Sequence, residues 1–233
     1  MSDLIPALPQ LLGDSSIARA LVGILTDVAK HSAMGAIVER FKAKRLLQWA
    51  AELNDDPSVT AEQIAEDDKL FAAFAVARCV AQAHSSERVS QFARLHASFL
   101  AGRVASPDEF AEFLHLLENL SEREFLILLG LRSIADNVGI RLGSNELLFG
   151  SQEPWRRLRT ELAHNLKLSE PEVDSIVQGL TRTGFVRILV GRNGELAATC
   201  STERLDQFLQ ALTKYDRTGI PKPPTISVSP YAR

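Results

Sequence analysis

The stretch LSEPEVDSIVQGLTRTGFVRILVGRNGELAATC, residues 168–200, decides the fold of the C-terminal part of this 233-residue chain. Ser169 and Glu172 form a capping pair, and apolar residues at helical spacing follow them. Gly184 ends this helix, and the β-branched run after it predicts a strand. Asn193-Gly194 is the strongest short signal for a hairpin turn, so the stretch predicts a helix followed by a β-hairpin.

The segments around this stretch complete a recognisable pattern. Residues 155–166 predict a preceding helix, and residues 121–131 predict a helix before that one. Together with the hairpin they resemble the winged-helix form of the helix-turn-helix, over residues 121–213. The segment from Leu168 through Val186 is similar to the recognition helix and first wing strand of MarR-like regulators. The resemblance implies a winged-helix domain at residues 121–215.

The resemblance also implies a surface that contacts double-stranded DNA. The third helix of such a domain enters the major groove, where Gln and Arg side chains are suited to reading adenine and guanine edges. Arginines at the start of the second helix and on the wing are placed for phosphate contacts. The candidate DNA-binding residues are therefore Arg156, Arg157, Arg159, Ser175, Gln178, Thr181, Arg182, Arg187 and Arg192.

Three carboxylates on the same helix favour a different partner. Glu170, Glu172 and Asp174 crowd its start, where they repel phosphates, although they also stabilise a helix N-terminus. Winged helices also serve as protein-binding or dimerising modules. Two functions therefore stay open. One is a non-enzymatic DNA-binding regulator. The other is a helical effector or adaptor that contacts protein through its winged helix and engages a membrane surface through its N-terminal amphipathic helix.

The N-terminal half predicts a helical bundle. Residues 1–120 contain apolar residues at helical spacing and capping pairs such as Thr60 with Gln63, which gives a mainly α fold class: a helical bundle followed by a winged-helix domain with one β-hairpin. The helix over residues 71–83 is apolar on more than one face, which predicts a homodimer or contact with a protein partner. Residues 216–233 contain four prolines and predict a flexible tail.

A basic-rich segment at residues 39–45 lies near Phe41 and Trp49, and three interpretations stay open. It forms a solvated face with an apolar seam, or it touches nucleic acid, or the helix from Ile17 to Trp49 lies on a membrane surface with Trp49 near the interface. Charges at Arg19, Asp27 and Lys30 make a membrane span costly, so we expect no insertion into a bilayer.

Composition and charge limit the class of protein. The chain has 26 Lys and Arg against 29 Asp and Glu, so positive charge for DNA must be gathered on one face. No basic, apolar leader begins the chain, and the two cysteines, Cys79 and Cys200, lie in apolar stretches. These features predict a cytoplasmic protein with reduced thiols.

The sequence predicts no enzyme. It contains no Gly-rich phosphate loop, no Gly-x-Ser-x-Gly elbow and no Cys-His nucleophile pair. Its five histidines are scattered, and only Glu161 and His164 form a helical i, i+3 pair, which is too few ligands for a metal site. We therefore expect no catalytic residues, no cofactor and no metal.

Overall fold

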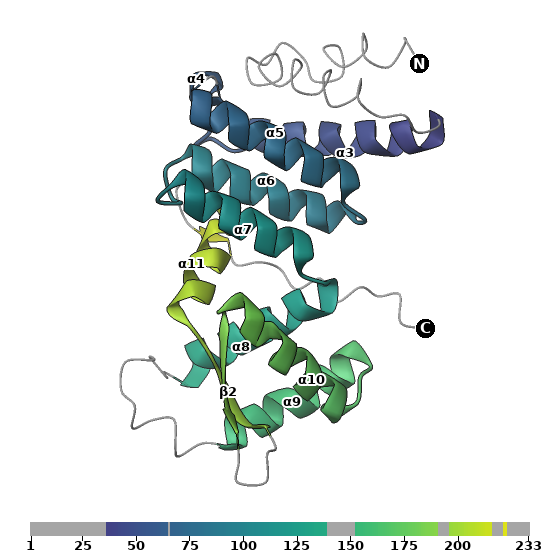
Figure 1. Cartoon of the computed structure of the whole chain (residues 1–233), viewed down its shortest axis with the longest axis vertical. Coiled ribbons are helices and arrows are strands. Elements are labelled where there is room, and N and C mark those ends of the chain that lie inside the picture. Colours follow the sequence, from purple (N-terminus) through teal and green to yellow (C-terminus); the bar gives the residue numbers. More distant parts are fainter. Residues whose placement is uncertain (1–35, 65, 139–151, 191–195, 216–220, 223–233) are drawn as a thin grey trace. The chain divides into compact units, whose positions relative to one another are not determined.

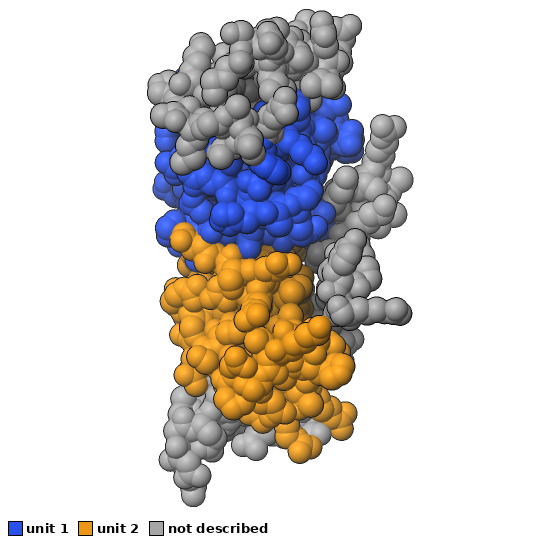
Figure 2. All heavy atoms as spheres, turned by 90° about the vertical axis from the view of Figure 1, so that its right-hand side faces the viewer, with its two compact units in different colours: residues 1–118, 211–233 blue, residues 119–210 orange. Residues whose placement is uncertain are grey.

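The computed structural model describes residues 36–64, 66–138, 152–190, 196–215 and 221–222 (Figure 1). Most of these residues lie in helices, which confirms the mainly α prediction. The chain forms two compact units, which Figure 2 shows in two colours. Unit 1 comprises Met1–Glu118 and Ala211–Arg233, and unit 2 comprises Asn119–Gln210. No helix in the described part of the chain is long and apolar enough to cross a membrane.

Unit 1 is built from helices that pack around one central member. The helices are α3 (Ala36–Asn54), α4 (Ala61–Ile64), α5 (Asp67–Gln82), α6 (Ser86–Leu100) and α7 (Pro107–Asn119). Helices α3, α5 and α6 pack on one another in pairs, and α7 joins α6 where Phe110 stacks on Phe99 with ring centroids 4.4 Å apart. A short antiparallel ladder, β3 (Lys214–Tyr215) with β4 (Pro221–Lys222), also belongs to this unit.

Helix α6 is the centre of unit 1. Every residue from Gln91 to Leu100 is buried except Arg94, which is half-buried. The Ser98 hydroxyl donates to the carbonyl oxygen of Ala211 at 2.6 Å, across 113 residues of sequence. This bond fastens the chain to α6 where it returns from unit 2. Burial on all sides explains why α6 carries both large apolar residues and small ones that admit close neighbours.

Helix α5 departs from the prediction in one respect. The sequence predicts burial on more than one face, and the residues from Ala72 to Ala81 that face α3 and α6 are indeed buried. Phe71, however, is 77% exposed and Phe74 is 37% exposed. The reason is that alanines form much of the buried surface of α5, so the two phenylalanines are left outside the packed helices.

The aromatic residues near the basic-rich segment also correct one interpretation. Trp49 is fully buried, whereas Phe41 is 59% exposed. A buried indole cannot sit at a membrane interface, so the interpretation that placed Trp49 there is wrong. The first part of the predicted amphipathic helix from Ile17 to Trp49 lies outside the described residues, which start at Ala36.

Unit 2 combines helices with one antiparallel strand pair. Its elements are α8 (Glu122–Val138), α9 (Gln152–Leu166), α10 (Glu170–Leu180), the 3-10 turn η2 (Thr181–Thr183), β1 (Val186–Val190), β2 (Leu196–Ser201) and α11 (Glu203–Ala211). Helices α8, α9 and α10 pack on one another, and β2 packs on α8 and α9. A Cβ on Gly130 would lie 3.1 Å from Leu162, so glycine permits the close approach of α8 to α9. Phe185 stacks on Phe208 of α11, with ring centroids 4.7 Å apart.

Strand β1 pairs antiparallel with β2, from Val186 opposite Ser201 to Val190 opposite Leu196, with a register shift at Leu189. Gly184 precedes β1 with φ of 72°, which confirms the predicted left-handed end of the α10 segment. Residues 191–195 connect the strands and are not described, so the predicted Asn193-Gly194 turn stays a prediction.

Helix starts follow the predicted capping chemistry closely. At α4, Thr60 N–H donates to Gln63 Oε1 at 2.7 Å, and Gln63 N–H donates to Thr60 Oγ1 at 3.3 Å. At α8, Ser121 N–H donates to Glu124 at 2.8 Å and Glu124 N–H donates back at 3.2 Å. These reciprocal bonds satisfy backbone donors that a helix start leaves unpaired, so the capping pairs mark where these helices begin.

His96 is a titratable group buried in the core of unit 1. Its ring is 0% exposed and stacks on Trp49 with centroids 5.5 Å apart, and Phe110 lies on it at 6.3 Å. Neither ring nitrogen has a hydrogen-bond partner among the described residues. Burial therefore lowers the pKa of His96 to about 3, because a charged ring would lose its hydration without gaining a partner.

We expect His96 to make unit 1 acid-labile. The unfolded chain binds a proton on this histidine below its ordinary pKa of 6.5, whereas the folded chain does not until about pH 3. His96 therefore leaves the free energy of unfolding unchanged above pH 6.5. Below pH 6.5 it lowers this free energy by roughly 1.4 kcal/mol per pH unit. His96→Phe retains the aromatic stack and removes the proton site, so its free energy of unfolding should fall less between pH 6 and 4. Urea unfolding across this range measures the difference.

The matched control is His84→Gln, because His84 is exposed. The free energy of unfolding of His84→Gln should depend on pH as that of the wild type does. If the free energy of unfolding of His96→Phe falls with pH as steeply as that of the wild type, His96 is not the group that makes unit 1 acid-labile.

Candidate functional site

The candidate site of unit 2 is the surface of α10 and of the elements packed around it. Ser169 N–H and its hydroxyl both donate to Glu172 Oε2, each at 2.7 Å, which fixes the start of the helix. These hydrogen bonds lower the pKa of Glu172. Val173, Val177 and Leu180 are fully buried and turn the opposite face outward. The outward face therefore has a defined orientation.

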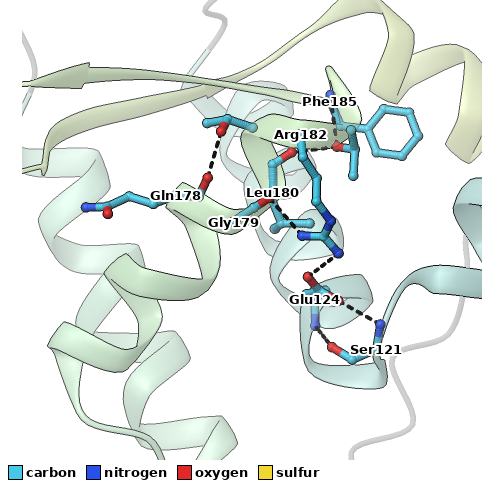
Figure 3. A network of polar contacts seen from close by, with 9 residues as sticks. Ser121, Glu124, Gln178, Gly179, Leu180, Arg182 and Phe185 are labelled. Atoms are coloured by element: carbon cyan, nitrogen blue, oxygen red, sulfur yellow. Dashed lines mark hydrogen bonds and ion pairs between the residues drawn. The ribbon is translucent and has the colours of Figure 1, made fainter.

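The polar residues predicted on that face are indeed exposed. Ser175 and Gln178 lie three residues apart on α10, and Thr181 follows where η2 begins. The Thr181 hydroxyl donates to the backbone carbonyl oxygen of Gln178 at 2.7 Å, and the exposed Gln178 side chain extends away from this bond (Figure 3). This face can offer both hydrogen-bond donors and acceptors to a partner.

The Arg182 side chain is exposed, but it forms a hydrogen bond and an ion pair within unit 2. Its guanidinium donates to the carbonyl oxygen of Gly179 at 2.8 Å and forms an ion pair with Glu124 at 2.8 Å (Figure 3). Burial alone raises the pKa of Glu124, but hydrogen bonds from Ser121 and Arg182 outweigh it and the pKa is lowered. The pair links the end of α10 to the start of α8, so the positive charge of Arg182 is largely balanced.

Arg159 is also engaged, on the other side of α10. It lies half-buried on α9 and forms ion pairs with Glu170 at 2.8 Å and with Asp174 at 3.1 Å. Burial raises the pKa of Asp174, Arg159 offsets only part of this, and the negative charge of Glu170 raises the pKa further. Two of the carboxylates that crowd α10 therefore hold α9 against α10. The predicted role of Arg159 as a phosphate ligand loses support for the same reason.

The remaining predicted cations lie on the elements beside α10. Arg156 and Arg157 are exposed on α9, and Arg187 is exposed on β1. Both α9 and β1 pack against α10. Arg192 lies outside the described residues. The structure thus brings three exposed arginines to the elements that flank the outward face, and it withdraws Arg159 and Arg182 into ion pairs.

The charge of unit 2 as a whole is close to balanced. Residues 119–210 contain eleven Lys and Arg against twelve Asp and Glu. Any attraction for an anionic partner must therefore come from local separation of charge and not from the unit as a whole. The ion pairs of Arg159 and Arg182 contribute to such a separation, because they balance acidic groups beside α10, whereas Arg156, Arg157 and Arg187 are exposed.

Sequence reasoning missed the two ion-pair clusters. Glu170 and Asp174 are spaced i, i+4 on one face of α10, a signal for a shared cation, but the helix spacing alone does not say which cation. The Glu124 to Arg182 pair joins residues far apart in sequence, so no local pattern reveals it. Glu161 and His164, the i, i+3 pair noted in the sequence, are both exposed. The described residues hold no cluster of three or more potential metal ligands.

Unit 1 contains a separate feature that the sequence did not indicate. A cavity of about 840 Å³ lies between α5 and α7, with apolar and charged side chains around it. The exposed rings of Phe71 and Phe74 form part of its wall, together with Phe99 and Phe110. A cavity of this size with exposed rings at its edge is a candidate binding surface in its own right.

Comparison of the chain with protein-family models, with curated proteins and with solved structures finds no match.

Proposed function

We propose that the chain is a non-enzymatic regulatory protein whose unit 2 takes the winged-helix form and binds duplex DNA through α10. The observation that supports this proposal is the exposed polar face of α10, with Ser175 and Gln178, between elements that expose Arg156, Arg157 and Arg187. A helix with outward amides and flanking arginines suits the major groove, where amides meet base edges and arginines meet phosphates. The packing of α10 on α8 and α9, followed by a strand pair, is consistent with the winged-helix form.

The proposed contact surface is narrower than the one that the sequence predicts. Arg159 and Arg182 hold α9 and α8 to α10 through carboxylates, so their contribution to DNA is structural. We assign phosphate contacts to Arg156, Arg157 and Arg187 because their side chains are exposed, and base contacts to Gln178, with Ser175 and Thr181 beside it. Arg192 remains a proposed phosphate contact from the sequence alone.

The test is fluorescence anisotropy of the full chain with random-sequence duplex at two salt concentrations. We expect salt-dependent binding in the wild type. The double variant Arg156→Ala with Arg157→Ala should weaken binding to all sequences. The salt slope, which is the steepness with which the logarithm of the binding constant falls with the logarithm of salt concentration, should decrease by about two, because each lost phosphate contact removes about one unit. Gln178→Ala should keep the slope and cost roughly 1–3 kcal/mol on a preferred sequence, once selection has identified one.

Lys44→Ala is the control for these variants, because Lys44 is exposed on α3 in unit 1. Unchanged binding assigns the contact to unit 2. A loss of binding instead supports the nucleic-acid interpretation of the basic-rich segment. An absence of duplex binding in the wild type at low salt would contradict the proposed function.

Releasing Arg182 from its ion pair should strengthen binding. Glu124→Gln removes the negative charge and keeps an oxygen that can accept from Ser121, so the helix cap is retained. The half-exposed pair is worth only about 0.5 kcal/mol of stability, so the fold should persist. The liberated guanidinium adds one cation beside α10, and the salt slope should rise by about one. Glu122→Gln, at an exposed neighbouring position without this pair, is the matched control.

A second candidate function is protein contact through the same face. It is favoured by Glu172, an exposed carboxylate at the start of α10. Glu172→Gln keeps an acceptor for the Ser169 cap and removes the charge. For DNA, relief of repulsion is worth about 0.5 kcal/mol at a separation of ~7 Å in water, so anisotropy should show tighter binding. Unchanged or absent duplex binding in this variant favours the protein partner.

A further inference from the structure

The exposed side of α5 carries apolar rings between two opposite charges. We call the α5 face the surface formed by Asp68, Phe71, Phe74, Ala75, Arg78 and Gln82. Phe71 is 77% exposed, and Ala75 beside it is half-buried, so a large ring stands next to a shallow depression. The cavity between α5 and α7 opens along the same residues. Exposed rings of this size are unfavourable in water unless another surface covers them.

The two ends of the α5 face carry opposite charges. Asp68 lies in the first turn of α5 and Arg78 lies ten residues further along, and both are exposed. Ten residues of α-helix span about 15 Å, so these two side chains cannot meet on the same helix. Neither forms an ion pair with another described residue. The face therefore presents a negative end, an apolar middle and a positive end.

We propose that the α5 face docks against the α5 face of a second copy of this chain, with the two helices antiparallel. A two-fold axis near Ala73 places Asp68 opposite the second copy's Arg78, and Phe71 opposite the second copy's Ala75. Each ring then enters the depression beside the partner's alanine, and the pair of Asp68 with Arg78 forms twice, once on each side of the axis. A two-fold contact requires a surface complementary to itself, and this arrangement of charge and size provides one.

The cavity supplies the room that such packing needs. Its wall includes Ala72 and Ala75 on α5 and Leu114 on α7, so the space beside the small residues is apolar. A phenylalanine ring from a second copy would fill part of this space and bury apolar surface on both sides. All the residues concerned belong to unit 1, so the inference does not depend on DNA binding by unit 2.

The experiment measures the mass of the full chain by light scattering and its self-association by sedimentation equilibrium. The wild type should have twice the chain mass of 25.6 kDa. Phe71→Asp should weaken the dimer by at least tenfold, because a carboxylate replaces the ring at the centre of the contact. Circular dichroism verifies the fold, which should persist because Phe71 lies outside the packed core.

Charge exchange identifies the antiparallel arrangement specifically. Asp68→Arg and Arg78→Asp should each weaken the dimer by about tenfold, because each places like charges opposite one another. The double variant Asp68→Arg with Arg78→Asp restores opposite charges and should return the dissociation constant to within about threefold of the wild type. Asp55→Arg, at an exposed position after α3, is the matched control and should change nothing.

Three results would overturn the proposal. One is a strict monomer at high micromolar concentration, which would mean that other residues of the chain or another protein cover the α5 face. Another is a dimer that is insensitive to Phe71→Asp, which would locate the contact elsewhere. The third is a double variant no tighter than either single variant, which would exclude the antiparallel pairing of Asp68 with Arg78.

Discussion

The enclosure of α6 on all sides is the constraint on which unit 1 depends. A helix buried around its whole circumference needs neighbours in every direction, and α3, α5, α7 and the returning chain at Ala211 supply them. The same enclosure sets the properties of its polar residues. Ser98 finds a carbonyl partner, whereas His96 lies between aromatic rings without one. Buried polar groups that lack partners are costly, so His96 is a weak point in a unit that is otherwise well packed.

Two groups of arginines can be distinguished in unit 2, those that form ion pairs within the unit and those whose side chains are exposed. Arg159 and Arg182 bind carboxylates on α10 and α8 and hold the helices together, whereas Arg156, Arg157 and Arg187 are exposed on α9 and β1, which pack against α10. The same residue type thus forms ion pairs within the unit and, in the proposed function, contacts DNA. The pairs are half-exposed, so their value lies more in fixing the position of α10 than in raising stability. A helix held at both ends presents its outward face with little freedom.

The sequence predicted features that depend on neighbouring residues and missed those that depend on distant ones. Capping pairs at Thr60 and Ser121 lie within four residues of their partners, so helix starts could be predicted. The exposure of Phe71 could not, because it depends on how alanines of α5 fit against α3 and α6. The candidate site divides in the same way. The outward position of Gln178 follows from helical spacing, but the engagement of Arg182 with Glu124 requires the packing of α10 against α8.

The bond between Ser98 and Ala211 has a consequence for the order in which the protein is made. Unit 1 contains the beginning of the chain and also its end, so its last component leaves the ribosome only after all of unit 2 has been synthesised. At about 5–20 residues per second, the 113 residues that separate the two partners take roughly 6–23 s to synthesise. During that interval Ser98 on α6 lacks its partner, the carbonyl oxygen of Ala211. Unit 2, in contrast, consists of one continuous stretch of the chain. The second unit can therefore finish folding before the first.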